Sequence, residues 1–184
     1  FGGAGVSTES GIPDFRSTDG LYHQKFEYPP ETILSHTFFY QNPEYFFRFY
    51  REKMLPLNYQ PNEAHKKLAA LEQAGKLRAI VTQNIDGLHQ KAGSKNVFEL
   101  HGSIYRNYCE KCGKFYPPEY IRDSAGVPRC TCGGRMISIS TSSWSVHPEN
   151  AEANNAATKA AITIFFINAY SLNSSLISGS RFPR

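Results

Sequence analysis

The first sixteen residues join a glycine-rich turn to a bent, charged loop, and few folds need both so close together. Gly3 and Gly5 permit positive φ and close backbone approach, so N–H groups there and the start of a following helix can face a diphosphate. A strict dinucleotide-binding turn would carry a third glycine at position 8, where the chain has Thr8. A bend with a carboxylate, an aromatic ring and a guanidinium comes next. The candidate ligand-binding residues are Gly3, Ala4, Gly5, Asp14, Phe15 and Arg16.

Two further polar clusters each follow a short apolar run that is typical of a buried strand. The first run, 77–82, ends in Gln83, Asn84 and Asp86, and the second, 97–100, ends in His101. In open parallel sheets ligands bind outside the carboxyl ends of the strands, so these side chains are expected at a site. Their amide and carboxylate groups suit ribose hydroxyls and a carboxamide. Taken alone, a histidine at a strand end is more often structural than catalytic.

All four cysteines lie in one segment, as Cys109-x-x-Cys112 and Cys130-x-Cys132. A glycine follows each pair, which lets backbone N–H groups turn back toward thiolate sulfurs and favours a tetrahedral zinc site. Four protein ligands leave no open position for water, so the predicted zinc is structural. Disulfides are the alternative, and they are disfavoured in a chain without an evident secretion signal.

Composition disfavours two classes of partner. The net charge is +4, but the lysines and arginines are not clustered in the runs that mark a nucleic-acid surface. No apolar run reaches the roughly eighteen residues of a membrane span, and the start has no charged, apolar leader. We therefore expect a cytoplasmic protein that binds no membrane.

Between the glycine turn and the first strand lies an aromatic-rich segment, 20–57. Helical spacing over 44–54 predicts short helices, and most of their rings are expected in a core rather than in a ligand box. Pro61 and Asn62 then open a helix that Gly75 closes.

In this order along the chain, the motifs resemble those of the sirtuins of bacterial type, the NAD-dependent protein lysine deacylases. The resemblance implies that NAD is the co-substrate, that the zinc is structural and that the partner is a protein carrying acetyl-lysine. His101 would be the catalytic base, and Asn84 and Asp86 would orient the nicotinamide end of NAD and a water or ribose hydroxyl. Phe15 would shield the reactive ribose. The implied NAD contacts are Gly3, Ala4, Gly5, Asp14, Phe15, Arg16, Gln83, Asn84, Asp86 and His101.

The expected fold class is α/β: an incomplete Rossmann-like parallel sheet with an inserted small domain, made of a helical module and a zinc ribbon with four cysteine ligands. We assign residues 1–20, 76–107 and 137–184 to the NAD-binding domain. Residues 21–75 form the cofactor-binding loop and helical module, and residues 108–136 form the ribbon.

The resemblance ends after Met136. Sirtuins continue with a substrate-binding loop and further strands, whereas here a Ser- and Asn-rich tail follows, with one apolar run at 162–167 that could supply a strand. The abrupt change suggests a frameshift. Phe1 leaves no room for the strand that should precede the glycine turn, which suggests truncation at the N-terminus.

The implied activity is removal of acetyl groups from lysine, giving nicotinamide and O-acetyl-ADP-ribose. The main alternative is a catalytically dead fragment that at most binds NAD or ADP-ribose. A second alternative is a zinc-ribbon interaction module for nucleic acid, based on Tyr105, Arg106, Tyr108, Lys111, Lys114 and Tyr116.

The acyl group is indicated by the end of the aromatic segment. Sirtuins that prefer succinyl or malonyl groups carry a Tyr-x-x-Arg pair there, where this chain has Tyr50 and Lys53. Lysine is a point charge without the bidentate fork of arginine. We therefore favour acetyl over succinyl.

Overall fold

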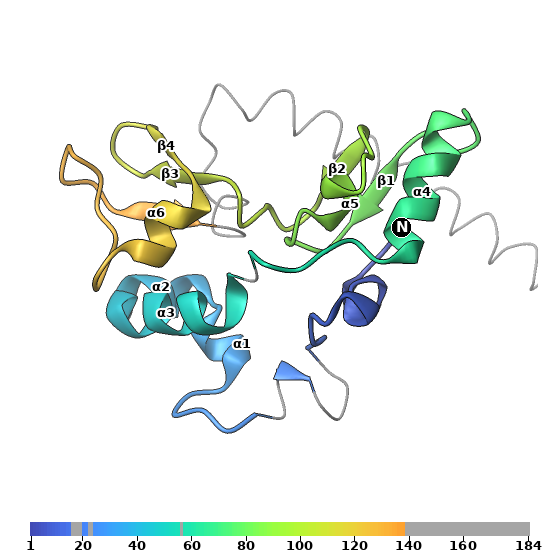
Figure 1. Ribbon diagram of the computed structural model, residues 1–184. Coiled ribbons are helices and arrows are strands. Elements are labelled where there is room, and N and C mark those ends of the chain that lie inside the picture. Colours follow the sequence, from blue (N-terminus) through green and yellow to red (C-terminus); the bar gives the residue numbers. More distant parts are fainter. Residues whose placement is uncertain (16–19, 22–23, 56, 139–184) are drawn as a thin grey trace, which may run out of the picture. The chain divides into compact units, whose positions relative to one another are not determined.

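The computed structural model describes residues 1–15, 20–21, 24–55 and 57–138 (Figure 1). Compact units are Phe1–Ser145 and Val146–Arg184, and the described residues belong to the first. Arg16, the apolar run at 162–167 and almost all of the predicted 137–184 segment lie outside the described residues. Within the described part of the chain, no helix has both the length and the apolar character needed to cross a membrane.

A parallel sheet holds the predicted strand ends together. β1 (Ile80–Thr82) pairs with β2 (Val97–Glu99) in parallel, as Figure 1 shows. The N-terminal segment joins the other edge of β1: the Gly2 N–H donates to the Val81 carbonyl at 2.9 Å, and Gln83 N–H donates to the Gly2 carbonyl at 3.0 Å. All three segments therefore run in one direction and end at one edge, as the sequence predicted.

The first strand is shorter than the predicted run 77–82, and the end of the preceding helix captures the amide at the start of that run. α4 (Glu63–Gln73) is capped by Asn62, whose side-chain oxygen accepts from the backbone of Ala64 and His65. At its other end Gly75 has φ +69. The next two amides, 76 and 77, donate back to the Leu71 carbonyl, so the first residue of the predicted run belongs to the end of the helix.

The aromatic-rich segment forms a helical module. It consists of α1 (Pro30–Ile33), α2 (His36–Gln41), α3 (Pro43–Phe49) and a π-helical turn, η4 (Tyr50–Met54). Phe39 and Phe47 are fully buried, and Phe39 meets Phe46 edge to face with ring centroids 4.9 Å apart. These rings form core, as predicted.

The cysteine segment folds into a small antiparallel sheet of order β4-β3-β5. β3 (Asn107–Cys109) lies between β4 (Phe115–Tyr116) and β5 (Met136–Ser138), and α6 (Pro118–Asp123) follows β4. Each strand is only two or three residues long, so the sheet needs further stabilisation from packing or a metal.

The helical module and the ribbon share one hydrophobic core. Ile33, Phe39 and Tyr50 from the module cluster with buried Ile121 and Met136 from the ribbon. Polar contacts also join the two parts, since the Arg51 guanidinium donates to the Ile121 carbonyl and the Tyr40 hydroxyl donates to Glu110. The expected inserted domain of module plus ribbon is therefore present.

Truncating the centre of this core should strongly destabilise the fold. Phe39 is 0% exposed, so Phe39→Ala should lower the free energy of unfolding by about 3–5 kcal/mol, through lost burial and an unfilled cavity. Urea denaturation measures the loss. Phe115, which is 52% exposed, is the matched control, and Phe115→Ala should cost less than about 1 kcal/mol. Equal losses would contradict this account of the core.

Candidate active site and zinc site

The glycine turn at the edge of the sheet leaves room for a ligand, although not through positive φ. Gly3 is extended, with φ −137°, and neither Gly3 nor Gly5 is among the glycines with positive φ, so neither uses the positive φ that glycine permits. The chain instead turns through two short 3-10 helices, η1 (Ala4–Val6) and η2 (Thr8–Ser10). A Cβ added at Gly5 would meet nothing within 4 Å, so the backbone there is open to close approach.

A buried serine ties this turn to the end of β1. The Ser7 hydroxyl donates to the Asp86 carboxylate at 2.6 Å and accepts from the Asn84 side-chain amide at 3.0 Å. All three side chains are buried, with Ser7 1% exposed. The structure therefore brings together Asn84 and Asp86, as predicted, and adds Ser7, which the sequence analysis missed. The sequence feature that could have identified Ser7 is its hydroxyl group within the glycine-rich turn.

Asp86 and Asn84 are held by the backbone as well. The second carboxylate oxygen of Asp86 accepts from the Leu88 N–H at 2.9 Å, where α5 (Leu88–Lys91) begins. The Asn84 N–H donates to the Thr82 hydroxyl at 3.0 Å. Gly87, between Asp86 and Leu88, has φ +67, and a Cβ there would come within 2.7 Å of the Tyr105 ring. The geometry of this turn is fixed on several sides.

Two buried histidines lie behind the serine, and the sequence analysis assigned neither a role. His65 Nε2 lies 3.5 Å from the Ser7 hydroxyl, and its Nδ1 lies 2.9 Å from the Asn62 side-chain oxygen. The His65 and His89 rings are 4.7 Å apart. Neither ring nitrogen of His89 has a hydrogen-bond partner within the described residues.

Burial shifts the titration of both histidines. Desolvation lowers the pKa of His65, and the Asp86 charge opposes part of that shift. Desolvation also lowers the pKa of His89, and the neighbouring His65 lowers it further. Both imidazoles are thus favoured in the neutral form, which leaves Asp86 as the acidic group of the cluster.

The remaining predicted residues that the structure describes are less buried than this cluster. His101 is exposed on the turn after β2, where the Leu100 N–H donates to the Thr82 carbonyl at 2.9 Å. Gln83 is exposed, and its side-chain oxygen would be 3.5 Å from a Cβ at Gly3. Asp14 and Phe15 are half-buried.

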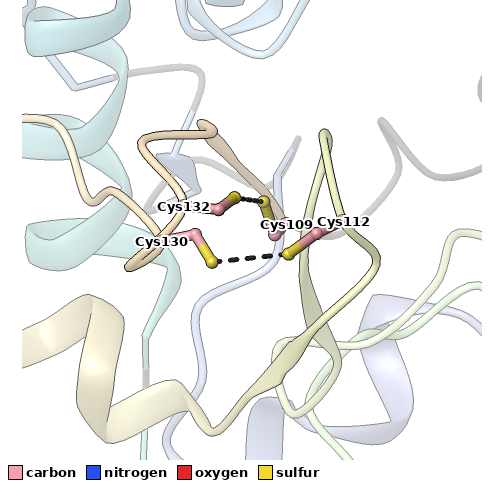
Figure 2. Close-up of side chains that lie close together, drawn as sticks. All are labelled: Cys109, Cys112, Cys130 and Cys132. Atoms are coloured by element: carbon pink, nitrogen blue, oxygen red, sulfur yellow. Dashed lines mark hydrogen bonds between the residues drawn. The ribbon is translucent and has the colours of Figure 1, made fainter.

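The four cysteine sulfurs converge on one point between the ribbon strands. Figure 2 shows Cys109 facing Cys132 and Cys112 facing Cys130, each pair with sulfurs 3.5 Å apart. All four sulfurs lie within 4.8 Å of one another, and none forms a disulfide. Zn–S bonds of about 2.3 Å in a tetrahedron place sulfurs about 3.8 Å apart, so the cluster fits zinc.

The surroundings favour the thiolate that zinc needs at Cys130 but not at Cys112. At Cys112 the Lys114 N–H lowers the pKa and the three neighbouring cysteines raise it, to about 12, so zinc would have to displace that proton. The Cys132 N–H and then the Tyr116 hydroxyl, which donates at 3.1 Å, lower the pKa of Cys130 to about 5. The Lys111 N–H donates to Cys109 at 3.4 Å. The backbone turns back toward the sulfurs, as the sequence predicted.

Gly134→Ala should disrupt the cysteine cluster. A Cβ there would lie 2.5 Å from the Cys109 sulfur and 2.7 Å from the Lys111 Cβ, so the backbone would have to shift. We expect zinc affinity to fall on the order of tenfold or more, measured by competition with a chromogenic chelator. In the same ribbon Gly126 has φ +58, and a Cβ there would meet nothing within 4 Å. Gly126→Ala therefore introduces backbone strain without a clash at the sulfurs, and this control variant should keep its zinc. Unchanged affinity in Gly134→Ala would refute the packing argument.

Mild acid should destabilise the fold through the buried histidines. The pKa values of His65 and His89 lie below the ordinary 6.5, so near and below that pH the unfolded chain binds protons that the folded chain does not. Their contribution is therefore complete above about pH 6.5 and is lost as the pH falls through the lowered folded values. Urea unfolding at a series of pH values measures the slope, which should be shallower in His89→Gln. An identical slope in His89→Gln would contradict the view that the buried His89 causes the loss of stability in acid.

Comparison with known proteins agrees with these features. The Sir2 family profile matches residues 3–166. NAD-dependent protein deacetylases of Clostridium perfringens and Clostridium acetobutylicum are 63% and 64% identical over 137 and 138 residues, which is 73% of this chain and 56% of each relative. The chain thus spans about half the length of these relatives.

Two solved Sir2 structures are also similar. One, a complex with a p53 peptide and NAD+, has a TM-score of 0.64 and 46% identity, and covers 75% of this chain and 56% of that one. The other, a variant with deacetylated p53 peptide and 3′-O-acetyl-ADP-ribose, has a TM-score of 0.68 and 44% identity, with 75% and 57% covered. Since the family profile spans most of the sequence, this chain belongs to the Sir2 family.

Proposed function

We propose that the protein removes acetyl groups from protein lysines in an NAD-dependent reaction, giving nicotinamide and O-acetyl-ADP-ribose. The observation that carries the proposal is the meeting of three polar strand ends at one edge of the sheet, with Ser7, Asn84 and Asp86 joined by hydrogen bonds there. The names of the relatives and the ligands of the similar Sir2 structures support it.

The open backbone at Gly5 and the exposed Gln83 beside Gly3 suit the phosphate and ribose groups of NAD. We assign Gly3, Ala4 and Gly5, with Asp14, Phe15 and Arg16, to holding NAD, and Phe15 to shielding the reactive ribose. NAD supplies an electrophilic ribose carbon, C1′, whose bond to nicotinamide breaks as the acetyl-lysine carbonyl oxygen bonds to it. The chain's own groups must position that carbon and move a proton.

Asn84 and Asp86 are assigned to orient the nicotinamide end and a ribose hydroxyl or water. Asp86 is 6% exposed and accepts from both Ser7 and Leu88, so its carboxylate has little freedom to turn. A fixed carboxylate in a water-poor site stabilises nearby positive charge without having to reorganise. Positive charge develops on the ribose as its bond to nicotinamide breaks, and we assign Asp86 to stabilise that charge.

His101 is assigned as the general base that takes a proton from a ribose hydroxyl. Its exposure on the turn after β2 leaves the imidazole accessible to a substrate. An imidazole suits the task because its ordinary pKa lies near working pH. The zinc, held by Cys109, Cys112, Cys130 and Cys132, has four protein ligands and is assigned a structural role only.

The environment of Lys53 supports acetyl over succinyl. Its ammonium pairs with Glu52 at 3.0 Å and lies 5.6 Å from the centre of the Phe26 ring. A lysine already paired with a carboxylate is a poor receptor for an acidic acyl group. We propose acetylated proteins as partners and a cytoplasmic location.

The ribbon is a weaker candidate for a nucleic-acid module. Tyr116 is only 6% exposed, and Tyr105 packs against the hydrophobic core, so neither ring is presented for stacking on a base. Lys114 lies over the Tyr116 ring, 5.3 Å from its centre. These contacts favour a structural ribbon.

Replacing the proposed base should greatly slow product formation without unfolding the chain. Incubation with acetyl-lysine peptide and NAD, followed by mass spectrometry of O-acetyl-ADP-ribose, should show a rate about 10²- to 10⁴-fold lower in His101→Ala. His36→Ala, which removes another exposed histidine, should keep the wild-type rate. If zinc-loaded wild-type protein binds NAD but forms no product, the catalytically dead fragment is the correct account. Equal activity in His101→Ala would refute the assigned base.

A further inference from the structure

One ion pair in the described part of the chain has a buried acid. Glu99, the last residue of β2, has a side chain only 3% exposed, and its Oε2 lies 2.7 Å from Arg106 Nη1. The acids of the other ion pairs in that part are 64–86% exposed. Exposed pairs contribute little to stability, whereas a buried carboxylate that loses its partner is strongly unfavourable.

This pair spans the turn that carries His101. Glu99 ends β2, and Arg106 immediately precedes β3, the strand that carries Cys109. His101 lies between them, in a segment tied down at two points: the Leu100 N–H donates to the Thr82 carbonyl at 2.9 Å, and the Ile104 N–H donates to the Ile85 carbonyl at 3.0 Å. Within the segment Gly102 adopts φ +76.

We propose that the Glu99–Arg106 pair is a clamp that positions His101, so that Arg106 and Glu99 are positioning residues for the proton-transfer step. The inference rests on the proposed function of His101. The Arg106 side chain joins the two ends of the turn directly, which the backbone hydrogen bonds of Leu100 and Ile104 do not do. Among the described residues, the Arg106 guanidinium is the one partner of the Glu99 carboxylate, and the Arg106 side chain is itself 45% exposed. Removing it lets water reach the carboxylate, but water does not bridge the two ends of the turn, so the chain around the end of β2 gains freedom to move.

The clamp also links the zinc ribbon to the catalytic turn. The strand that begins just after Arg106 holds a cysteine ligand at its far end, and the strand that ends at Glu99 belongs to the parallel sheet. A shift of β3 would therefore move the His101 turn through the ion pair. This gives a structural zinc site a physical route to the chemistry without contact with substrate.

The test separates the two chemical steps of the proposed reaction. Nicotinamide release does not require His101 to take a proton. It is measured by the exchange of labelled nicotinamide into NAD in the presence of acetyl peptide. Product formation needs the base. Arg106→Gln should lower product formation by about 10- to 100-fold, the range expected for a misplaced catalytic group, while nicotinamide exchange stays within about twofold. Arg106→Lys, which keeps the cation, should recover most of the product rate.

Two further variants distinguish positioning from general stability. The double variant E99Q/R106Q leaves no buried charge unpaired, so it should recover much of the thermal stability lost in Arg106→Gln but not the ratio of product to exchange. Arg122→Gln breaks an exposed ion pair on the same ribbon and should change neither quantity. Equal loss of product and exchange in Arg106→Gln would overturn the proposal in favour of a folding or binding defect.

Amide hydrogen exchange tests whether the ion pair holds the turn in place, independently of enzyme activity. In Arg106→Gln, a peptide covering 100–105 should exchange deuterium faster than in the wild type, with the β1 peptide unchanged. Unaltered protection of 100–105 would overturn the clamp even if the enzyme is active. If the wild type forms no product while Arg106→Gln still loses protection there, the proposed function fails and the clamp survives as a structural feature.

Discussion

The site depends on the parallel pairing of the N-terminal segment with β1 and of β1 with β2. Two hydrogen bonds between Gly2 and its neighbours on β1 fix the start of the chain against residues about eighty positions away. Because every segment in a parallel sheet ends at the same edge, the glycine turn, the Asn84–Asp86 turn and the His101 turn come to one place. Chemistry that needs backbone N–H groups, a carboxylate and a base together becomes possible there.

At this edge, the buried polar residues affect both the stability of the fold and the proposed site. A histidine whose two ring nitrogens lack partners within the described residues is costly to bury, and here it lies against His65. Burial lowers the pKa of both rings and so favours their neutral form, which reduces the positive charge beside the Asp86 carboxylate. Ser7 can then be shared between Asp86 and Asn84 without competition from an imidazolium.

Local patterns identified much of this architecture. The cap at Asn62 and the stop at Gly75 predicted α4 because both act within one turn of the helix. The cysteine spacing predicted the metal cluster although the sulfurs that meet are 18 and 23 residues apart, because two closely spaced cysteine pairs are typical of one shared zinc ion. Ser7 and His65 were missed because their partners lie 79 and 58 residues away, and no periodicity reports such contacts. The sequence did not predict the φ values of Gly3 and Gly5, because glycine permits many conformations and only the neighbours select one.

The central claim is that the three strand ends form one NAD site. Titrating NAD into zinc-loaded, nitrogen-15-labelled protein and following backbone amide resonances tests it most directly. Saturable shifts concentrated at 3–5, 83–86 and 101, with the ribbon turn at 111–114 unmoved, are the result that this account predicts. Absence of saturable shifts at those positions, or shifts confined to the ribbon, would contradict it.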